Sequence, residues 1–542
     1  MDYDFIVIGS GFGGSVSALR LTEKGYRVLL LEKGRRMGPE DFPKTNWDVR
    51  RWLWFPNLGL RGLFRLSFFR HVTIVSGVGV GGGSLVYGNT LPVPKDSFFK
   101  APTWAHLADW KTELAPHYAE ARRMLGAVPN PHLTPADHVL RQVAEDLGRA
   151  RDFKRTEVGV YFGEPGRTVP DPFFGGEGPE RTGCILCGGC MLGCRHGAKN
   201  TLDQNYLFLA ERRGLKILAE TRATGVQPLE GGGYRVEATE GLGFLKHRRS
   251  FTTHNVVFAA GVLGTVELLL QLKADPKGLP KLSGRLGEFV RTNSESLIGV
   301  VTPRRDVDFS KGIAISSILH TDEHSHVEPV RYPEGSGFWR LMLAPHVGGD
   351  SAAVRLAQLV GTTLRRPVKL LRALAVRDFA KQSVILLYMR TLDGSLRMKL
   401  GRSPFSLFRR RLKTDAASGE RPKASIPEAT DIARRVSDKV DGFPESLLTE
   451  TLLGIPTTAH ILGGCCMGES IESGVVDSEH RLFGYEGLYV VDGSVVSANP
   501  GVNPSLTITA LAERAMSRIP PKGTRVTSAR ADVRRDSPKV ET

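Results

Sequence analysis

The stretch that decides the fold is Phe5-Ile-Val-Ile8-Gly9-Ser-Gly11-Phe-Gly13-Gly14, near the N-terminus. Its continuous branched apolar run is typical of a strand buried on both faces of a parallel sheet, and it leads directly into a glycine-rich turn. Apolar residues between Val16 and Leu21 then offer one side of a helix that Gly25 can cap, and residues 28–31 form a second strand ending at Glu32. This order predicts one βαβ unit.

The βαβ unit predicts a dinucleotide-binding site. Gly9 permits the tight turn, Gly11 lets a pyrophosphate approach the backbone amides at the helix N-terminus, and Gly14 lets helix and strand pack closely. Glu32 stands eighteen residues after Gly14, close to the spacing of about twenty at which a carboxylate accepts hydrogen bonds from an adenosine ribose. The motif by itself does not choose between NAD and FAD.

Composition places the chain among globular proteins. Of 542 residues, 41% are hydrophobic and 24% charged, which excludes a disordered, collagenous or disulfide-scaffold protein. No uninterrupted apolar stretch reaches the roughly 18 residues that would predict a membrane-spanning helix. The acidic, strand-like start from Asp2 to Ile8 has no basic n-region, so we expect no secretory signal and a cytoplasmic location.

Four further stretches make the interpretation specific. Gly77-Val-Gly79-Val-Gly81-Gly82-Gly83-Ser84 leads to Asn89, and a run so rich in glycine lets the backbone lie against a flat ring or a phosphate. The C-terminal part holds Thr458-Ala-His460-Ile-Leu-Gly463-Gly464, then Tyr489-Val-Val-Asp492-Gly493-Ser494, then Asn499-Pro-Gly501-Val-Asn503-Pro504-Ser505. Together with the βαβ unit, these motifs resemble the glucose-methanol-choline (GMC) oxidoreductases, most closely their cholesterol oxidase branch, over nearly the whole chain.

The resemblance implies FAD and an α/β fold, in which a doubly wound, Rossmann-like FAD-binding domain is interleaved with an α+β substrate domain on a mostly antiparallel sheet. We expect the FAD domain at residues 1–40, 200–290 and 455–520, the substrate domain at 41–199 and 291–454, and a disordered tail at 521–542. The strand expected at residues 256–260 would end in a turn that touches the cofactor, and Val226 matches the position whose backbone meets the adenine. The implied cofactor-binding residues are Gly9, Gly11, Gly14, Glu32, Gly81, Gly82, Asn89, Val226, Gly261, Asp492, Gly493 and Asn503.

The same resemblance implies the catalytic pair. Oxidising a secondary alcohol to a ketone removes the hydroxyl proton and a hydride from one carbon, and the flavin can accept the hydride. His460 occupies the family position that handles the proton, and its ordinary pKa of about 6.5 suits a base near neutral pH. Asn503 matches the second family position, where an uncharged amide orients the alcohol oxygen.

Other polar residues carry weaker signals. The run His320-Thr-Asp-Glu-His324-Ser-His326 has the residue types of a metal tract, but alternating polar residues on a strand or loop explain it, and we expect no metal there. Isomerisation of a steroid double bond needs a carboxylate that moves a proton between carbons. Glu295 and Glu328 lie in the expected substrate domain, and the sequence does not choose between them.

A cysteine run departs from the best-known cholesterol oxidases. Cys184-Ile-Leu-Cys187-Gly-Gly-Cys190-Met-Leu-Gly-Cys194 has the thiolate spacing of bacterial ferredoxins, without their following proline because Arg195 stands there. In two-cluster ferredoxins the fourth cysteine serves the other cluster, so Cys465 or Cys466 would supply the missing ligand. Three interpretations stay open: an iron–sulfur cluster on Cys184, Cys187, Cys190 and Cys194, a zinc site, or reduced buried thiols.

Positive charge is concentrated in one part of the chain. The formal net charge is +16, and residues 355–413 hold fifteen Lys or Arg against two Asp. Residues 364–377 alternate basic and apolar positions as an amphipathic helix does, and residues 50–70 mix five arginines with aromatic residues. This pattern suits peripheral contact with an anionic membrane, and a solvated charged face is the alternative. Without a recognition motif, nucleic acid is not expected as a partner.

The leading prediction is FAD-dependent oxidation of a 3β-hydroxysteroid such as cholesterol to the ketone, with oxygen as acceptor and with double-bond isomerisation as a further step. The alternative is an FAD and iron–sulfur dehydrogenase of another bulky alcohol that passes electrons to a carrier. A third hypothesis, from another class, is a flavin-loaded protein that binds membrane surfaces without turnover.

Overall fold

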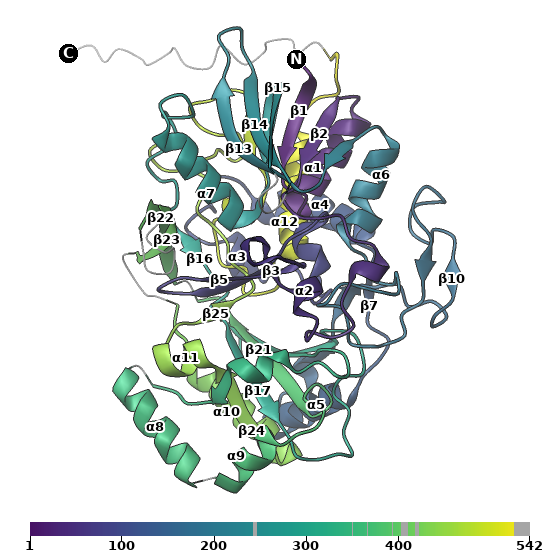
Figure 1. Cartoon of the computed structure of the whole chain (residues 1–542), viewed down its shortest axis with the longest axis vertical. Helices are drawn as coiled ribbons and strands as arrows, with labels where there is room; N and C mark the ends of the chain where they lie inside the picture. The colour runs from purple at the N-terminus through teal and green to yellow at the C-terminus, as the bar shows by residue number, and fades with distance from the viewer. Residues whose placement is uncertain are drawn as a thin grey trace, which may run out of the picture.

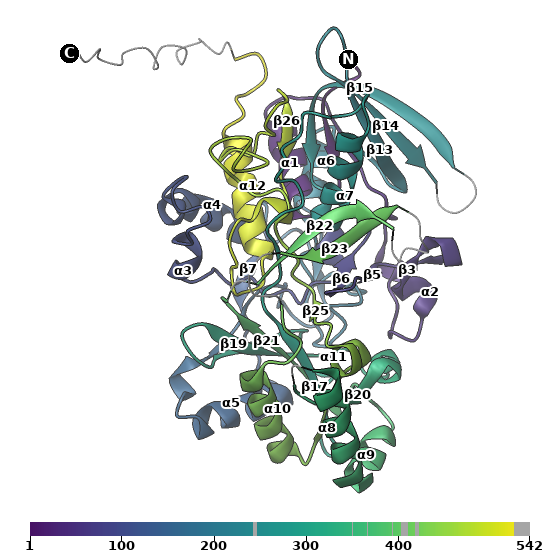
Figure 2. The same cartoon turned by 90° about the vertical axis from the view of Figure 1, so that its left-hand side faces the viewer.

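The structure is a computed structural model that describes residues 1–241, 246–349, 351–365, 367–392, 394–402, 410–417 and 422–524. The expected disordered tail at 521–542 therefore lies outside the described residues from position 525 onward. Two large sheets organise the molecule, one in the upper and one in the lower half of Figures 1 and 2. The functional interpretation depends on what lies between them.

The upper sheet grows from the N-terminal βαβ unit. Strand β1 (Tyr3–Ile8), helix α1 (Phe12–Glu23) and strand β2 (Val28–Leu31) follow each other as the glycine motif predicts, and the side chains of Val28–Leu31 are all buried. The strand order is β12-β2-β1-β15-β14-β13, with β26 also paired to β15. The pairs β12–β2, β2–β1, β1–β15 and β15–β26 are parallel, whereas β13, β14 and β15 form an antiparallel meander. The returning strands are β12 (Lys216–Leu218), β13 (Thr221–Pro228), β14 (Tyr234–Glu240), β15 (His247–Phe258) and β26 (Leu488–Val490).

Helices cover this sheet and bring distant segments together. Helix α12 (Ser505–Ser517) packs against α1 and against α4 (Trp110–Met124), and α6 (Tyr206–Arg212) also contacts α1. Helix α7 (Gly261–Ala274) follows β15 directly, so the C-terminal ends of β1 and β15 and the starts of α1 and α7 meet at one edge of the sheet. Ligands of open α/β sheets bind at such an edge.

The lower sheet is antiparallel throughout, with the order β20-β24-β17-β21-β19-β18-β8. One face packs onto α5 (Pro135–Asp146) and α10 (Pro427–Val440) through residues such as Ile298, Val300 and Leu386. Alternation along the strands turns Leu297, Ile385 and their neighbours to the other face, which lines a cavity. The strands are β8 (Phe153–Arg155), β17 (Ser296–Val301), β18 (Ser317–His320), β19 (Ser325–Val330), β20 (Leu343–Pro345), β21 (Ser383–Arg390) and β24 (Phe443–Leu447).

Smaller elements connect the two halves. A hairpin of β5 (Phe64–Phe68) and β6 (Thr73–Gly77) pairs with β25 (Thr457–Thr458), just before His460. A second small sheet joins β16 (Val290–Arg291), β22 (Ser395–Gly401) and β23 (Arg411–Ala416). The remaining helices are α2 (Val49–Trp52), α3 (Asp96–Phe99), α8 (Ala352–Arg365), α9 (Pro367–Leu374) and α11 (Leu448–Leu453), and the remaining strands are β3 (Trp54–Phe55), β4 (Leu60–Arg61), β7 (Ala127–Pro129), β9 (Glu157–Gly159), β10 (Thr168–Val169) and β11 (Arg181–Thr182).

The predicted fold class is confirmed: a Rossmann-like α/β part is combined with a part built on an antiparallel sheet. Part of the predicted patch of aromatic residues at 50–70 is buried. Trp52 is fully buried and its ring stacks on Phe64 at 5.2 Å between centroids, so these two rings belong to a core, whereas Phe68 is 39% exposed. Among the described residues, no helix combines the length and the apolar character needed to cross a bilayer.

Candidate active site

A large cavity of about 1370 Å³ runs between the two sheets. Its walls come from both glycine-rich turns, the start of α7, the hairpin β5–β6, the segment around His460 and the inner face of the lower sheet. Sites for one small ligand measure about 300–1,000 Å³. This cavity therefore has room for a dinucleotide together with a second molecule.

The first glycine turn fits a dinucleotide. At Gly9, Gly13 and Gly14 a Cβ atom would lie within 2.4 Å of a backbone oxygen of the protein, so these glycines are needed for the tight turn itself. At Gly11 a Cβ would meet no protein atom within 4 Å, and the residue lines the cavity. The open space at Gly11, next to the N-terminus of α1, is where a pyrophosphate can approach the backbone amides.

Hydrogen bonds fix the carboxylate of Glu32 at the end of β2. Its carboxylate accepts hydrogen bonds from the Ser10 hydroxyl at 2.7 Å and from the Gly34 amide at 2.8 Å, and it lines the cavity. The same Ser10 hydroxyl accepts a hydrogen bond from the Gly81 amide at 3.1 Å. Ser10 thus ties the second glycine run to the first and fixes the carboxylate that would bind a ribose.

The second glycine run and the C-terminal motif complete this end of the cavity. A Cβ at Gly82 would lie 2.7 Å from the Cα of Gly11, so the two turns touch and only glycine fits. Asp492 accepts hydrogen bonds from the Gly261 amide at 2.9 Å and from the Thr265 hydroxyl at 2.6 Å, which joins the motif to the start of α7. Gly82, Gly261, Asp492 and Gly493 all line the cavity, as the FAD implied by the sequence requires.

Four of the predicted cofactor residues do not line the cavity themselves. Gly14 and Gly81 shape the turns, as described above. Asn89 is fully buried with φ of 68°, and its neighbours Gly88 and Thr90 form the wall instead. Val226 lies in the core of the upper sheet, three residues after Ala223, which lines the cavity.

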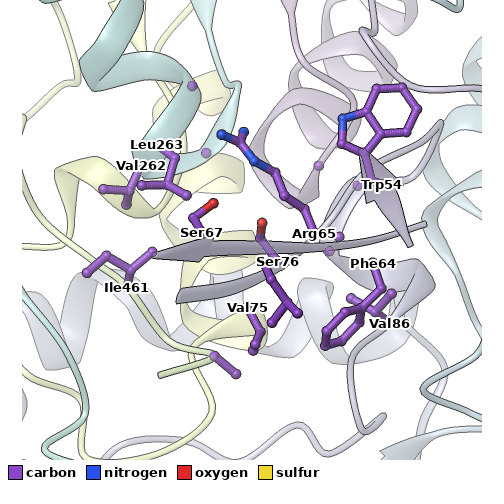
Figure 3. A pocket seen from close by; sticks show the side chains of 18 of the residues that line it. Trp54, Phe64, Arg65, Ser67, Val75, Ser76, Val86, Val262, Leu263 and Ile461 are labelled. Atoms are coloured by element: carbon purple, nitrogen blue, oxygen red, sulfur yellow. The ribbon is translucent and has the colours of Figure 1, made fainter. Parts of the chain in front are cut away.

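The hairpin β5–β6 gives the cavity two sides of different polarity. Figure 3 shows Arg65, Ser67 and Ser76 projecting from the hairpin toward the side of Val262 and Leu263, at the start of α7. Phe64 and Val75 project from the other side, together with Val86. The polar side faces the dinucleotide end, and the apolar side faces away from it.

His460 forms a buried ion pair. Its Nδ1 lies 2.7 Å from an oxygen of Glu295, and the other oxygen of Glu295 accepts the Ala459 amide at 2.8 Å. Burial acts to lower the pKa of His460, but the charge and hydrogen bond of Glu295 and the charge of Glu328 outweigh it and raise the pKa. Because Nδ1 is engaged by a carboxylate, it carries the proton of the neutral ring, and Nε2 is left as the basic nitrogen.

Asn503 lies next to this pair, and its side-chain carbonyl is free to accept a hydrogen bond. Both His460 and Asn503 line the cavity, and the carbonyl oxygen of the Asn503 side chain has no hydrogen-bond partner among the described residues. Glu328, on β19, is fully buried, and burial raises its pKa to about 8, although His460 and Asn503 act to lower it. His326 lies 3.7 Å from Glu328 on the same face of β19. The structure therefore brings His460, Asn503, Glu295 and Glu328 together.

The inner face of the lower sheet forms an apolar floor. It consists of alternate residues of β17, β19 and β21, extended by large side chains from the neighbouring loops. These lining residues are Leu297, Ile315, Val330, Ile385, Leu387, Tyr332, Trp339, Leu343 and Phe379. A bulky apolar molecule suits this floor, since few polar groups are present to be left unpaired.

The partnership of Glu295 with His460 is the main feature that the sequence does not reveal. The two residues are 165 positions apart, so no local spacing connects them. Glu328 carries a weak signal, because a carboxylate stands in the otherwise apolar run Val327-Glu328-Pro329-Val330. A buried carboxylate on an apolar strand is a candidate for a functional group.

The predicted iron–sulfur cluster and its zinc alternative gain no support. Cys184, Cys190 and Cys194 lie around Val160 and Ala198 in a small apolar cluster. Burial, together with the neighbouring cysteines, raises the pKa of Cys184 to about 12 and of Cys187 to about 11, so these thiols are neutral when no metal is bound. Cys465 and Cys466 are buried elsewhere in the structure. In the part of the chain that the structure describes, no three His, Cys, Asp or Glu side chains are arranged to hold a metal ion.

Comparisons with known proteins agree with this geometry. Family models described as "GMC oxidoreductase" match residues 179–273 and 385–512, and a model described as "NAD(P)-binding Rossmann-like domain" matches residues 7–47. A protein named cholesterol oxidase from Acinetobacter baumannii is 48% identical over 96% of this chain and 95% of its own length. Another protein of that name, from Mycobacterium tuberculosis, is 46% identical over 96% of this chain and 92% of its own length.

More distant relatives share the architecture. A 2-methyl-1,2-propanediol dehydrogenase from Mycolicibacterium austroafricanum is 25% identical over 94% of both chains. The crystal structure of a pyridoxine 4-oxidase from Mesorbium loti superimposes with a TM-score of 0.59 at 16% identity, covering 95% of this chain and 98% of that one. At that identity the likeness shows the fold alone.

Proposed function

Since the chain belongs to the GMC oxidoreductase family and is an FAD-dependent alcohol oxidoreductase, we propose that it oxidises the 3β-hydroxyl of a cholesterol-like sterol to the ketone, with oxygen as acceptor. The observation that carries the proposal is the His460–Glu295 pair, which lies beside Asn503 in the wall of the large cavity, above its apolar floor. A sterol has one hydroxyl on a rigid hydrocarbon body, and this distribution of polar and apolar groups matches the site. The names of the relatives at 48% and 46% identity support the same substrate class.

Side chains of the site accept the hydroxyl proton of the alcohol and stabilise the resulting charge. Nε2 of His460 accepts the hydroxyl proton, and the carboxylate of Glu295, 2.7 Å from Nδ1, stabilises the imidazolium that results. The carboxamide of Asn503 hydrogen-bonds the alcohol oxygen and fixes the direction of the carbinol C–H. The backbone amides near Gly11 and the carboxylate of Glu32 would hold FAD, which would supply the acceptor for the hydride from this carbon.

We assign the added isomerisation step to Glu328 instead of Glu295. Both oxygens of Glu295 are engaged, one by His460 and one by the Ala459 amide. Neither oxygen of Glu328 makes a hydrogen bond of good geometry with a described residue, although Asn503 and His326 lie close by, and Glu328 shares its face of β19 with Val330, which lines the cavity. A carboxyl with a pKa of about 8 can give and take a proton near neutral pH. Glu328→Gln should keep ketone formation and lose the ultraviolet absorbance of a conjugated enone product.

A substrate comparison in air tests the proposed function. Cholesterol and cyclohexanol are given to the purified holoenzyme, and both ketone and hydrogen peroxide are measured. Cholesterol should bury at least five more methylene-sized groups in the cavity than cyclohexanol does, and each contributes about 0.8 kcal/mol. We therefore expect kcat/KM to be about 1000-fold higher for the sterol than for cyclohexanol. Equal kcat/KM values would contradict the proposed substrate class. Ketone without peroxide, together with rapid reduction of an artificial acceptor, would favour the dehydrogenase that passes electrons to a carrier.

A further inference from the structure

Helices α8 and α9 carry an apolar surface that points away from the protein. We call this surface the outer face, and it consists of Leu356, Val360, Leu364, Val368, Leu371 and Leu374. Leu364 is 74% exposed and Leu371 is 65% exposed, among the highest values for large hydrophobic residues in the described chain. Both helices lie at the outer edge of the lower half of the molecule in Figures 1 and 2.

The spacing of these residues makes the outer face continuous. Leu356, Val360 and Leu364 are four positions apart, so they form one stripe along α8. The opposite side of α8 holds Arg355, which is buried and donates hydrogen bonds to the carbonyl oxygens of Thr451 and Gly349. The helix is therefore attached by its polar side and exposes its apolar side, the reverse of a helix on an ordinary water-facing surface.

The charged residues of α8 and α9 themselves are all of one sign. Residues 352–377 contain six Lys or Arg and no Asp or Glu. Arg365, Arg372 and Arg377 are exposed, and none of them forms an ion pair with another described residue. Lys369 is paired with Asp441 at 2.7 Å. An exposed apolar stripe with free arginines beside it is complementary to lipid chains and anionic headgroups at the surface of a bilayer.

The outer face also lies close to the cavity. Ala373, on the inner side of α9, packs in one cluster with Phe379 and Leu343, and both of these residues line the cavity. Helix α8 contacts α11 and β20, and Leu447, which immediately precedes α11, lines the cavity as well. The helix pair therefore separates the apolar floor of the cavity from the surroundings of the protein.

We propose that the outer face of α8 and α9 is a docking surface for an anionic phospholipid bilayer. The leucines and valines enter the boundary between headgroups and acyl chains, and the arginines contact anionic headgroups. Docking in this way brings the end of the cavity near Leu343 and Phe379 to the bilayer, and this consequence for substrate delivery rests on the proposed function. The docking itself does not depend on the substrate.

The test is flotation of the purified holoenzyme with sterol-free vesicles of phosphatidylcholine, with or without phosphatidylglycerol. The wild-type protein should float with the anionic vesicles, at least about ten-fold more than with neutral ones, and added salt should weaken the binding. L364S/L371S should reduce binding to anionic vesicles by about ten-fold or more. R365Q/R372Q should remove most of the preference for anionic vesicles. V93S is the matched control, since Val93 is also exposed (42%) but lies outside both helices, and it should bind as the wild type does.

Several results would overturn the proposal. The first is a wild-type protein that does not float with anionic vesicles, and the second is an L364S/L371S variant that floats as well as the wild type. The third is a wild-type dimer in sedimentation that L364S/L371S abolishes, because a second copy of the chain would then be the occupant of the outer face. Because the vesicles hold no sterol, failure of docking is distinguishable from failure of the proposed function. Activity on detergent-dispersed sterol should stay unchanged in L364S/L371S, whereas activity on sterol in anionic vesicles should fall.

Discussion

Glu295→Gln removes the negative charge behind His460 while keeping a side chain of nearly the same shape. In the structure the carboxylate contacts Nδ1 of His460 at 2.7 Å and accepts the Ala459 amide at 2.8 Å, and Glu295 is only 2% exposed. Glutamine can keep one of these hydrogen bonds, but it cannot neutralise an imidazolium. A hydrogen bond to a charged group contributes about 1.5–3 kcal/mol. We therefore expect kcat/KM to fall about 10- to 160-fold.

The pH profile separates this role from a merely structural one. Wild-type activity should fall as pH decreases through the raised pKa of His460, because the protonated ring cannot accept the alcohol proton. Without the charge of Glu295, the largest remaining influence on His460 is burial, which lowers its pKa. The acid limb of the kcat/KM profile should then move to lower pH. The assay is initial-rate kinetics on sterol across the pH range, with FAD content measured in parallel.

Glu445→Gln is the matched control for this prediction. Glu445 is also a buried carboxyl of the lower sheet, and burial raises its pKa to about 7, but it does not line the cavity. This variant should keep the position of the acid limb. An unmoved acid limb in Glu295→Gln, with a loss of rate no larger than in the control, would show that Glu295 does not set the pKa of His460.

Three further predictions concern the cavity. His460→Gln should lower kcat/KM about 10²- to 10⁴-fold while FAD stays bound, and full sterol oxidation by this variant would exclude His460 as the base. Gly11→Ala should leave the fold intact, because no protein atom lies within 4 Å of the new Cβ. The variant should bind FAD at least about ten-fold more weakly, which corresponds to a loss of about 1.4 kcal/mol in binding free energy. Gly231→Ala, which also meets no protein atom within 4 Å, should retain FAD as the wild type does. Glu328 has a folded-state pKa of about 8 against an ordinary value of 4.5, so the unfolded chain loses its proton first and stability should decrease as pH rises from about 4.5 to about 8. Glu328→Gln should make this decrease less steep in urea titrations, and an unchanged slope would argue against the buried, protonated carboxyl.

The local motifs were predictable because their physical causes are local. The run from Phe5 to Gly14 contains its own strand, turn and helix start, and the structure has β1 and α1 where the pattern places them. The strand before Gly261 and the helix after Pro504 follow in the same way from short patterns of apolar residues. In each case the residues that decide the conformation are neighbours in the chain.

The partners of the proposed catalytic and cofactor-binding groups were not predictable, because the fold brings them together over long separations. Glu295 meets His460 only after the chain returns through β17 and β25, and Ser10 meets Gly81 across 71 positions. The amphipathic pattern at 364–377 indicated the helix found at Pro367–Leu374 but not its orientation, which depends on the buried contacts of Ala373. Trp52 and Phe64 look like part of a surface patch in sequence, but they pack against each other and Trp52 also packs against Trp339, and both are buried.

The most direct measurement of the central claim is the single-turnover rate at which sterol bleaches the flavin absorbance without oxygen, recorded against pH for the wild-type enzyme and for His460→Gln. If His460 takes the hydroxyl proton, the wild-type rate should rise with pH through the pKa of His460 and reach a plateau. The variant should be slower by about two orders of magnitude or more, with this rise absent. Equal rates and equal pH profiles in the two proteins would contradict the account.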